Sequence, residues 1–155
     1  AQAEPDSLIT GEFNEWCPSF SPDGKWIVYC SDQDGQYQIY VRPYPLVDKR
    51  FWKVSDKIGE EPIWSPAGDE LFYRSGNRLM VVRYQSKEDF VYEFPEVAWE
   101  GRFRNVFGFS YDISQDGKRF LILKPAFDDT AVEEIRIVEN WSAEIQRTLK
   151  ADAGP

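Results

Sequence analysis

The chain has 155 residues, with 18 Lys and Arg against 27 Asp and Glu, which gives a formal net charge of -9. Such an acidic surface repels polyanions, so we expect no nucleic-acid partner. Histidine is absent, which excludes Ser-His-Asp and Cys-His catalysis and histidine-ligated zinc. We therefore expect neither a metal nor a cofactor.

The apolar segments are short, and none reaches the ~18 residues that a membrane span needs. The N-terminal stretch AQAEPDS is polar, so no signal peptide is visible and we expect no membrane insertion. Aromatic residues make up 16% of the chain, beside 10 Gly and 10 Pro. This composition favours an all-β, turn-rich fold.

An internal repeat organises residues 7–149, with residues 1–6 and 151–155 left as tails. Each copy has an apolar strand, a Ser-Pro-Asp-Gly-like turn and a second apolar strand. The copies read PSFSPDGKWIVY, PIWSPAGDELFY and YDISQDGKRFLI. Their turn serines, Ser21, Ser65 and Ser114, are 44 and 49 residues apart, and one four-stranded propeller blade needs ~40 to 50 residues. In such turns Pro presets the first corner and Gly supplies the positive φ.

In chain order, the copies predict three propeller blades over residues 16–55, 61–100 and 107–139. Third strands are expected at residues 36–42, 78–84 and 134–139, and fourth strands at residues 51–55 and 97–100. The third unit has no fourth strand, because helical spacing of apolar residues predicts a short C-terminal helix over residues 140–150.

The missing strand is expected at the other end of the chain. The segment Ser7-Leu8-Ile9-Thr10 precedes the first hairpin by about the interval at which Lys53-Val54-Ser55 precedes the second. We therefore interpret residues 7–10 as an outer strand whose blade lies elsewhere. Donating such a strand from the opposite terminus removes two open sheet edges and closes a ring.

The repeat carries a family resemblance. The run FSPDGKWIVY from Phe20 to Tyr29, followed by Gln38 to Val41, resembles the repeat of TolB-type β-propellers, also found in prolyl-oligopeptidase propellers and in sensor domains of some bacterial Ser/Thr kinases. The ending Asn140-Trp141 is similar to the C-terminal portion of such proteins. The resemblance implies a six-bladed ring and a periplasmic or extracytoplasmic location, while the sequence itself leaves the compartment open.

Three blades are half of that ring. We expect two copies of the chain to form a homodimeric ring in which Leu8, Ile9 and Thr10 are exchanged across the interface. The competing interpretation is an excised fragment of a larger sensor propeller, whose other blades lie on further sequence.

Propeller ligands usually meet loops at the mouth of the channel. Here these loops are expected between an outer strand and the next inner strand, at residues 11–16, 56–61 and 101–108. Their aromatic and charged side chains suit a protein or peptide ligand. The candidate residues are Glu12, Asn14, Glu15, Trp16, Glu60, Glu61, Arg102, Arg104, Asn105 and Phe107. The alternative without a binding function is that these surface charges only keep the protein soluble.

A catalytic alternative needs two carboxyls across a substrate, as in a carbohydrate-active or lyase propeller. Glu60 and Glu61 are neighbours, so strand alternation predicts that they point to opposite faces and do not converge. Only a pair between blades, such as Glu15 with Glu60, meets the requirement. We therefore expect a non-catalytic binding or scaffold module.

Two further features have structural interpretations. Cys17 and Cys30 lie on the two strands of the first hairpin, where they are expected to be cross-strand neighbours and free thiols. The run Asp32-Gln33-Asp34-Gly35 has the spacing of a calcium-loop opening, but the rest of that loop is missing, which indicates a hairpin turn.

Overall fold

The computed structural model describes residues 7–125 and 134–139. Every regular element in this part of the chain is a β-strand. Blade 1 contains β1 (Glu15–Phe20), β2 (Trp26–Ser31), β3 (Gln38–Pro43) and β4 (Trp52–Lys53). Blade 2 contains β5 (Glu60–Trp64), β6 (Glu70–Ser75), β7 (Arg78–Ser86), β8 (Phe90–Tyr92) and β9 (Glu96–Glu100). Blade 3 contains β10 (Tyr111–Ile113), β11 (Arg119–Lys124) and β12 (Glu134–Glu139).

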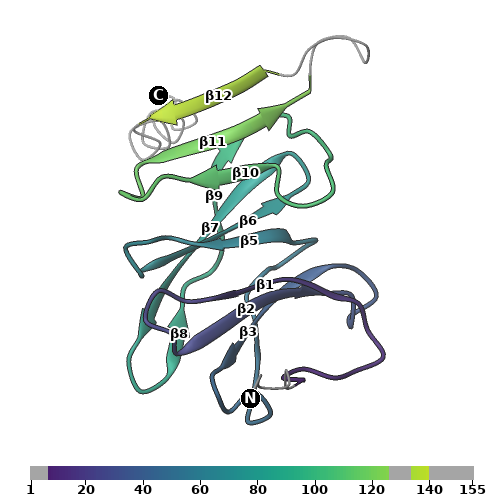
Figure 1. Cartoon of the computed structure of the whole chain (residues 1–155). Helices are drawn as coiled ribbons and strands as arrows, with labels where there is room; N and C mark the ends of the chain where they lie inside the picture. Colours follow the sequence, from purple (N-terminus) through teal and green to yellow (C-terminus); the bar gives the residue numbers. More distant parts are fainter. Residues whose placement is uncertain (1–6, 126–133, 140–155) are drawn as a thin grey trace, which may run out of the picture.

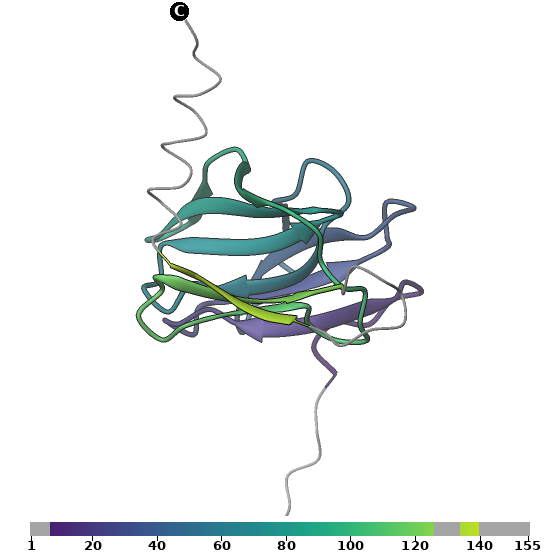
Figure 2. The same cartoon turned by 90° about the horizontal axis from the view of Figure 1, so that it is seen from above.

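The three sheets are antiparallel and follow one another in chain order (Figure 1). Blade 1 has the strand order β1-β2-β3-β4, and in blade 2 the outer strand β9 pairs with β7. Blade 3, in green and yellow, lies at the opposite end of the stack from blade 1, in purple and blue. In the view from above in Figure 2 the blades overlap, with blade 3 in front and blade 1 behind it. The predicted all-β, propeller-type arrangement of three consecutive blades is confirmed.

The Ser-Pro-Asp-Gly turns form as their residue types predict. Gly24, Gly68 and Gly117 have positive φ values of 70°, 81° and 68°. In the first turn the Ser21 hydroxyl donates to the Asp23 carboxylate over 2.7 Å and accepts from the Trp26 amide over 3.0 Å. The serines therefore act as turn-bonding groups.

Neighbouring blades pack through apolar faces. Between blades 1 and 2, Val28 and Val41 of blade 1 share a core cluster with Leu71 and Tyr73 of blade 2. Between blades 2 and 3, a second cluster includes Phe72 of blade 2 and Phe120 of blade 3. These clusters hold the blades in sequence, so the core of the molecule lies between sheets.

β8 was not predicted from the sequence. β8 forms a small hairpin with the end of β7, and it places Phe90 among aromatic rings of both blades. The ring centroid of Phe90 lies 5.3 Å from Trp26, 5.5 Å from Trp52 and 5.2 Å from Tyr84. β8 therefore supplies the aromatic residue that fills the space between blades 1 and 2 at this end.

The N-terminal end of the repeat differs from the prediction, and the C-terminal end lies outside the described residues. Residues 7–10 form no strand in the single chain, so the predicted exchange strand is not assembled within it. The helix expected at residues 140–150 lies outside the described residues. In the described part of the chain, no helix is long and apolar enough to cross a membrane.

The cysteines are not the cross-strand neighbours that the sequence predicted. Cys30 stands opposite Trp16, because the register of β1 shifts between Trp16 and Ser19. Cys17 lies in this bulge with a φ of 51°. Both thiols are free, and the Cys30 thiol donates to the Gly59 carbonyl over 3.2 Å. Burial raises the pKa of the Cys30 thiol to about 12.

Replacing Phe90 by Ala tests the aromatic packing between blades 1 and 2. Phe90 is only 2% exposed, so Phe90→Ala is expected to lower the free energy of unfolding by about 3–5 kcal/mol, the usual cost of such a cavity. Phe94→Ala is the matched control, since Phe94 is 75% exposed and its loss is expected to cost about 0.5 kcal/mol or less. Urea unfolding measures both, and equal losses would contradict the packing.

Candidate functional site

The three predicted mouth loops lie at one end of the blades. Residues 11–14 precede β1, residues 56–59 precede β5 and residues 101–110 precede β10. Each therefore leads into the first strand of a blade, and the Ser-Pro-Asp-Gly turns lie at the opposite end of the same strands. We refer to these segments as the mouth loops.

Arg74, at the end of β6, brings three of the predicted site residues together. Its guanidinium donates to the Glu60 carboxylate over 2.9 Å and to the Asn105 side-chain oxygen over 2.9 Å. Its Nε lies 3.0 Å from Oε1 of Glu61. The single cation therefore joins two adjacent carboxylates of blade 2 to the loop that enters blade 3.

Glu61 is the most enclosed member of this cluster, at 1% exposure. Its Oε2 accepts from the amide and the hydroxyl of Ser110, over 2.7 and 2.6 Å. Its backbone carbonyl accepts from the Tyr111 hydroxyl over 2.7 Å. A buried carboxylate requires such a set of partners. We call Glu60, Glu61, Arg74, Asn105 and Ser110 the Arg74 cluster.

The expectation that Glu60 and Glu61 point apart was wrong. The register of β5 shifts between Glu60 and Ile63, and Glu61 has a φ of 55°. This bulge breaks the simple alternation of side chains along a strand, so both carboxylates contact Arg74. Cys17 has the equivalent conformation in β1, and both residues precede a proline.

Burial also affects the neighbouring phenol. Desolvation, followed by the charge of Glu61, raises the pKa of the Tyr111 hydroxyl well above its ordinary range. Tyr111 therefore stays protonated and acts as a hydrogen-bond donor to Glu61, which makes it part of the support of the cluster.

The predicted residues of the first mouth loop have separate roles. Asn14 donates from its amide and its side chain to the carboxylate of Asp32, over 2.9 and 2.7 Å, so it ties the loop to the β2–β3 turn. These two hydrogen bonds lower the pKa of Asp32. Glu12 is exposed. Asn14 is thus a structural residue of the mouth.

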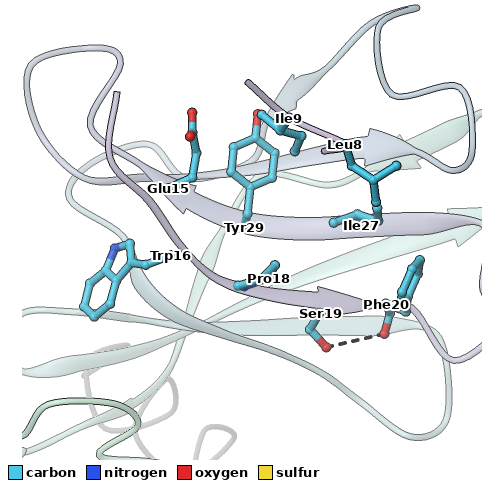
Figure 3. Close-up of a pocket in the computed structure, with 9 residues that line it drawn as sticks. All are labelled: Leu8, Ile9, Glu15, Trp16, Pro18, Ser19, Phe20, Ile27 and Tyr29. Carbon is cyan, nitrogen blue, oxygen red and sulfur yellow. Dashed lines mark hydrogen bonds between the residues drawn. The ribbon is translucent and has the colours of Figure 1, made fainter. Parts of the chain in front are cut away.

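Glu15 lines a groove on the face of blade 1 that is turned away from blade 2 (Figure 3). Trp16 also borders this groove, while its ring packs against the core cluster between blades 1 and 2. The groove has a volume of about 390 Å³. Leu8 and Ile9 lie over Ile27 and Tyr29 at one side of it, as Figure 3 shows. Glu15 therefore does not share a site with Glu60, whose carboxylate is held by Arg74.

The third mouth loop presents both aromatic and basic groups. Phe107 is fully exposed, and Arg102 is exposed as well. Arg104 is half-buried and its amide donates to the carbonyl of Leu123 over 2.9 Å. Phe103, in the same loop, is buried and packs edge-on against Trp99. The loop is thus anchored by alternate residues and presents the others to solvent.

Sequence reasoning missed Arg74 and Ser110. An arginine at the end of an apolar strand has no distinguishing pattern, and its partners come from positions 14 and 31 residues away. Ser110 stands four residues before the turn serine Ser114, as Glu61 stands four before Ser65. This equivalence was the one signal that could have linked the two positions.

The geometry limits what the mouth can do chemically. The two carboxylates that lie close together share one guanidinium, and one of them is sealed from solvent. General acid–base catalysis needs a carboxyl that reaches a substrate and exchanges a proton with it. The Arg74 cluster instead joins blades 2 and 3 rigidly beneath the exposed side chains of the mouth loops.

Comparison with known proteins identifies the fold. No protein-family model and no curated protein matches the sequence. Among solved structures, an oligogalacturonate lyase from Vibrio parahaemolyticus is similar with a TM-score of 0.51 and 16% identity, over 67% of this chain and 27% of that one. TolB from Acinetobacter baumannii is similar with a TM-score of 0.51 and 22% identity, over 79% of this chain and 29% of that one.

Both similar structures are β-propellers. This chain therefore folds as part of a β-propeller, and it spans less than a third of the length of either protein. At these identities the likeness extends to the fold alone, since one propeller scaffold carries many unrelated functions.

Replacing Arg74 by Met tests the Arg74 cluster. The variant leaves Glu61 buried without its cation, and we expect a loss of about 3–5 kcal/mol in the free energy of unfolding, as for other broken buried pairs. Arg78→Met is the control. Arg78 pairs with Glu100 on the surface, so its loss is expected to cost about 0–1 kcal/mol.

Proposed function

We propose that this chain is a non-catalytic β-propeller module that binds a protein or peptide segment at its mouth loops, and that two copies form a six-bladed ring. The observation that supports binding most directly is that the acidic groups of the mouth are already paired while an aromatic side chain there is exposed. Its carboxylates Glu60 and Glu61 are already bound to Arg74, whereas Phe107 is exposed on a loop anchored from below.

The exposed groups of the mouth suit a peptide. Phe13 is 50% exposed and Phe109 is 42% exposed, beside the fully exposed Phe107. Aromatic side chains of this kind are over-represented in protein interfaces because they bury much area at little entropic cost. Glu12 and Arg102 add charges of both signs, which supply specificity more than affinity.

The alternative function is that of a carbohydrate-active or lyase-type propeller enzyme. One similar structure is an oligogalacturonate lyase, which gives this alternative a concrete substrate to test. Against it stands the placement of the acidic groups, because Glu15 lines the outer groove of blade 1 while Glu60 and Glu61 pair with Arg74.

The ring is proposed from the number of blades. Propellers close with 4 to 8 blades, and the described chain contains three. Two copies supply six, and the exchange of Leu8, Ile9 and Thr10 gives each third blade an outer strand. The competing arrangement is a longer polypeptide that carries the remaining blades itself.

Substrate and peptide assays separate the two functions. We expect no increase in the ultraviolet absorbance of an unsaturated product when the chain is mixed with oligogalacturonate. We expect selection from a phage-displayed random peptide library to yield binders. Affinity for those peptides is expected to fall about tenfold or more in Phe107→Ala, as for a central aromatic contact.

Phe94→Ala is the matched control for peptide binding, since Phe94 is also exposed but lies between β8 and β9, outside the mouth loops. Turnover of oligogalacturonate that is lost in Glu15→Gln or Glu60→Gln would contradict the proposal and support the enzyme. If peptide affinity falls equally in the Phe94 and Phe107 variants, the peptides bind outside the mouth loops.

Light scattering tests the ring. At micromolar concentration the mass is expected to be twice the 18.1 kDa of one chain. A folded chain with the mass of a monomer at these concentrations would contradict the two-copy ring and leave the longer polypeptide as the source of the missing blades.

A further inference from the structure

The outer face of blade 1, turned away from blade 2, repeats the side of blade 2 that packs against blade 1. In blade 2, Trp64 and Tyr84 form an edge-on pair with ring centroids 5.0 Å apart, and each ring is 5% exposed. In blade 1, Phe20 and Tyr44 form the same kind of pair at 4.9 Å, but they are 53% and 42% exposed. Ile27 and Tyr29 on the same face of blade 1 are buried, at 5% and 1% exposure, so the uncovered part of this face is its Phe20–Tyr44 pair.

The repeat places these pairs at equivalent positions. Phe20 stands immediately before the turn serine Ser21 and pairs with Ile27 across the hairpin, as Trp64 stands before Ser65 and pairs with Leu71. The groove of Figure 3 lies on this face and is lined by Phe20 and Ile27. Its occupant is therefore expected to resemble what covers blade 2.

Blade 1 covers blade 2 with a face that carries Trp26 at one end and an aliphatic patch beside it. Val28 and Val41 are directly opposite in the β2–β3 ladder, belong to the same core cluster as Trp64, and are fully buried. The equivalent ladder position in blade 3 pairs Leu121 with Ile137. Leu121 is 42% exposed, so blade 3 ends in the aliphatic half of a blade contact.

The next ladder position shows the same correspondence. Cys30 pairs with Ile39 in blade 1, and Leu123 pairs with Ile135 in blade 3. Cys30 and Ile39 are fully buried between blades 1 and 2, whereas Leu123 is only half-buried. The two ends of the chain therefore carry complementary halves of the contact that already joins its first two blades.

We infer that the outer face of blade 1 binds the outer face of blade 3 of a second copy, and that the reciprocal contact forms at the same time. This inference rests on the proposed two-copy ring and names the surfaces that close it. A two-fold axis relates the two contacts, so both aromatic faces and both aliphatic faces are covered and no face is left to extend a filament.

The segment that contains Leu8 and Ile9 fits the same arrangement. These residues precede the turn serine Ser21 by the interval at which Trp52 and Lys53 of β4 precede Ser65. β4 pairs with β3 and continues into blade 2. By the same register, Leu8 is expected to pair with Ile137 of the second copy, as Trp52 pairs with Val41. The edge of β12 would then gain the outer strand that blade 3 lacks in its described residues.

Opposite charges placed on the two faces test the contact. Phe20→Arg and Leu121→Glu alter exposed side chains, so each variant chain is expected to fold. In a reciprocal dimer each change is present at both contacts and buries an unpaired charge. We expect the dimer dissociation constant, measured by analytical ultracentrifugation, to rise about 100-fold or more in either single variant.

The double variant Phe20→Arg/Leu121→Glu places the two charges opposite each other at both contacts. It is expected to recover dimerisation at least about tenfold relative to either single variant. Phe94→Arg is the control, since Phe94 is 75% exposed and lies on neither face, and it is expected to dimerise as the natural chain does.

The outcomes separate this inference from the proposed ring. If the natural chain is a monomer, the two-copy ring fails, and this inference fails with it. If the natural chain is a dimer that both single variants leave intact, the ring proposal stands and the assignment of these faces is overturned. If the single variants dimerise more weakly and the double variant does not recover dimerisation, the pairing of the two faces is also overturned.

Discussion

The constraint on which this structure depends is that each face of a blade must be covered by another blade. A four-stranded sheet with two apolar faces is not stable alone in water, and repeat folds gain their stability from contacts between neighbours. Blade 2 satisfies this on both sides, with Tyr73 buried toward blade 1 and Phe72 buried toward blade 3. Blades 1 and 3 each pack against only one neighbouring blade, and large apolar side chains stay exposed on their other faces. Phe20 and Leu121 are exposed because each lies on a blade face that has no neighbouring blade.

The Arg74 cluster serves a different purpose from the apolar contacts. Apolar faces are non-directional and tolerate sliding, whereas Glu61 accepts hydrogen bonds from one particular amide and hydroxyl of Ser110. Such a buried charge costs desolvation and returns little net stability. Its effect is to fix how blade 3 sits against blade 2 at the end that carries the mouth loops. The exposed Phe107 is therefore presented from a fixed base.

The sequence was most informative where the structure is local. Turn chemistry around Ser21 and Gly24 depends on residues within a few positions, so the hairpins and the order of the blades followed from it. β8 was missed because Phe90 gains its place from rings of two other strands. The site was only partly predictable: Glu60, Glu61 and Asn105 do meet, but through Arg74, whose partners are brought near only by folding. The prediction that the two carboxylates diverge failed because alternation does not hold through a bulge.

Assembly and ligand binding are linked in the proposed ring. A ligand at the axis of a propeller meets loops from blades on all sides, and three blades supply only half of those loops. The mouth of one chain, with Phe107 on its third loop and Glu12 on its first, would be completed by the same loops of the second copy. A ligand that contacts both sets binds the closed ring better than the single chain, and mass action then stabilises the ring in proportion to ligand concentration. The acidic, histidine-free composition is compatible with this role, because recognition by packed aromatic side chains at a rigid rim requires no titrating group.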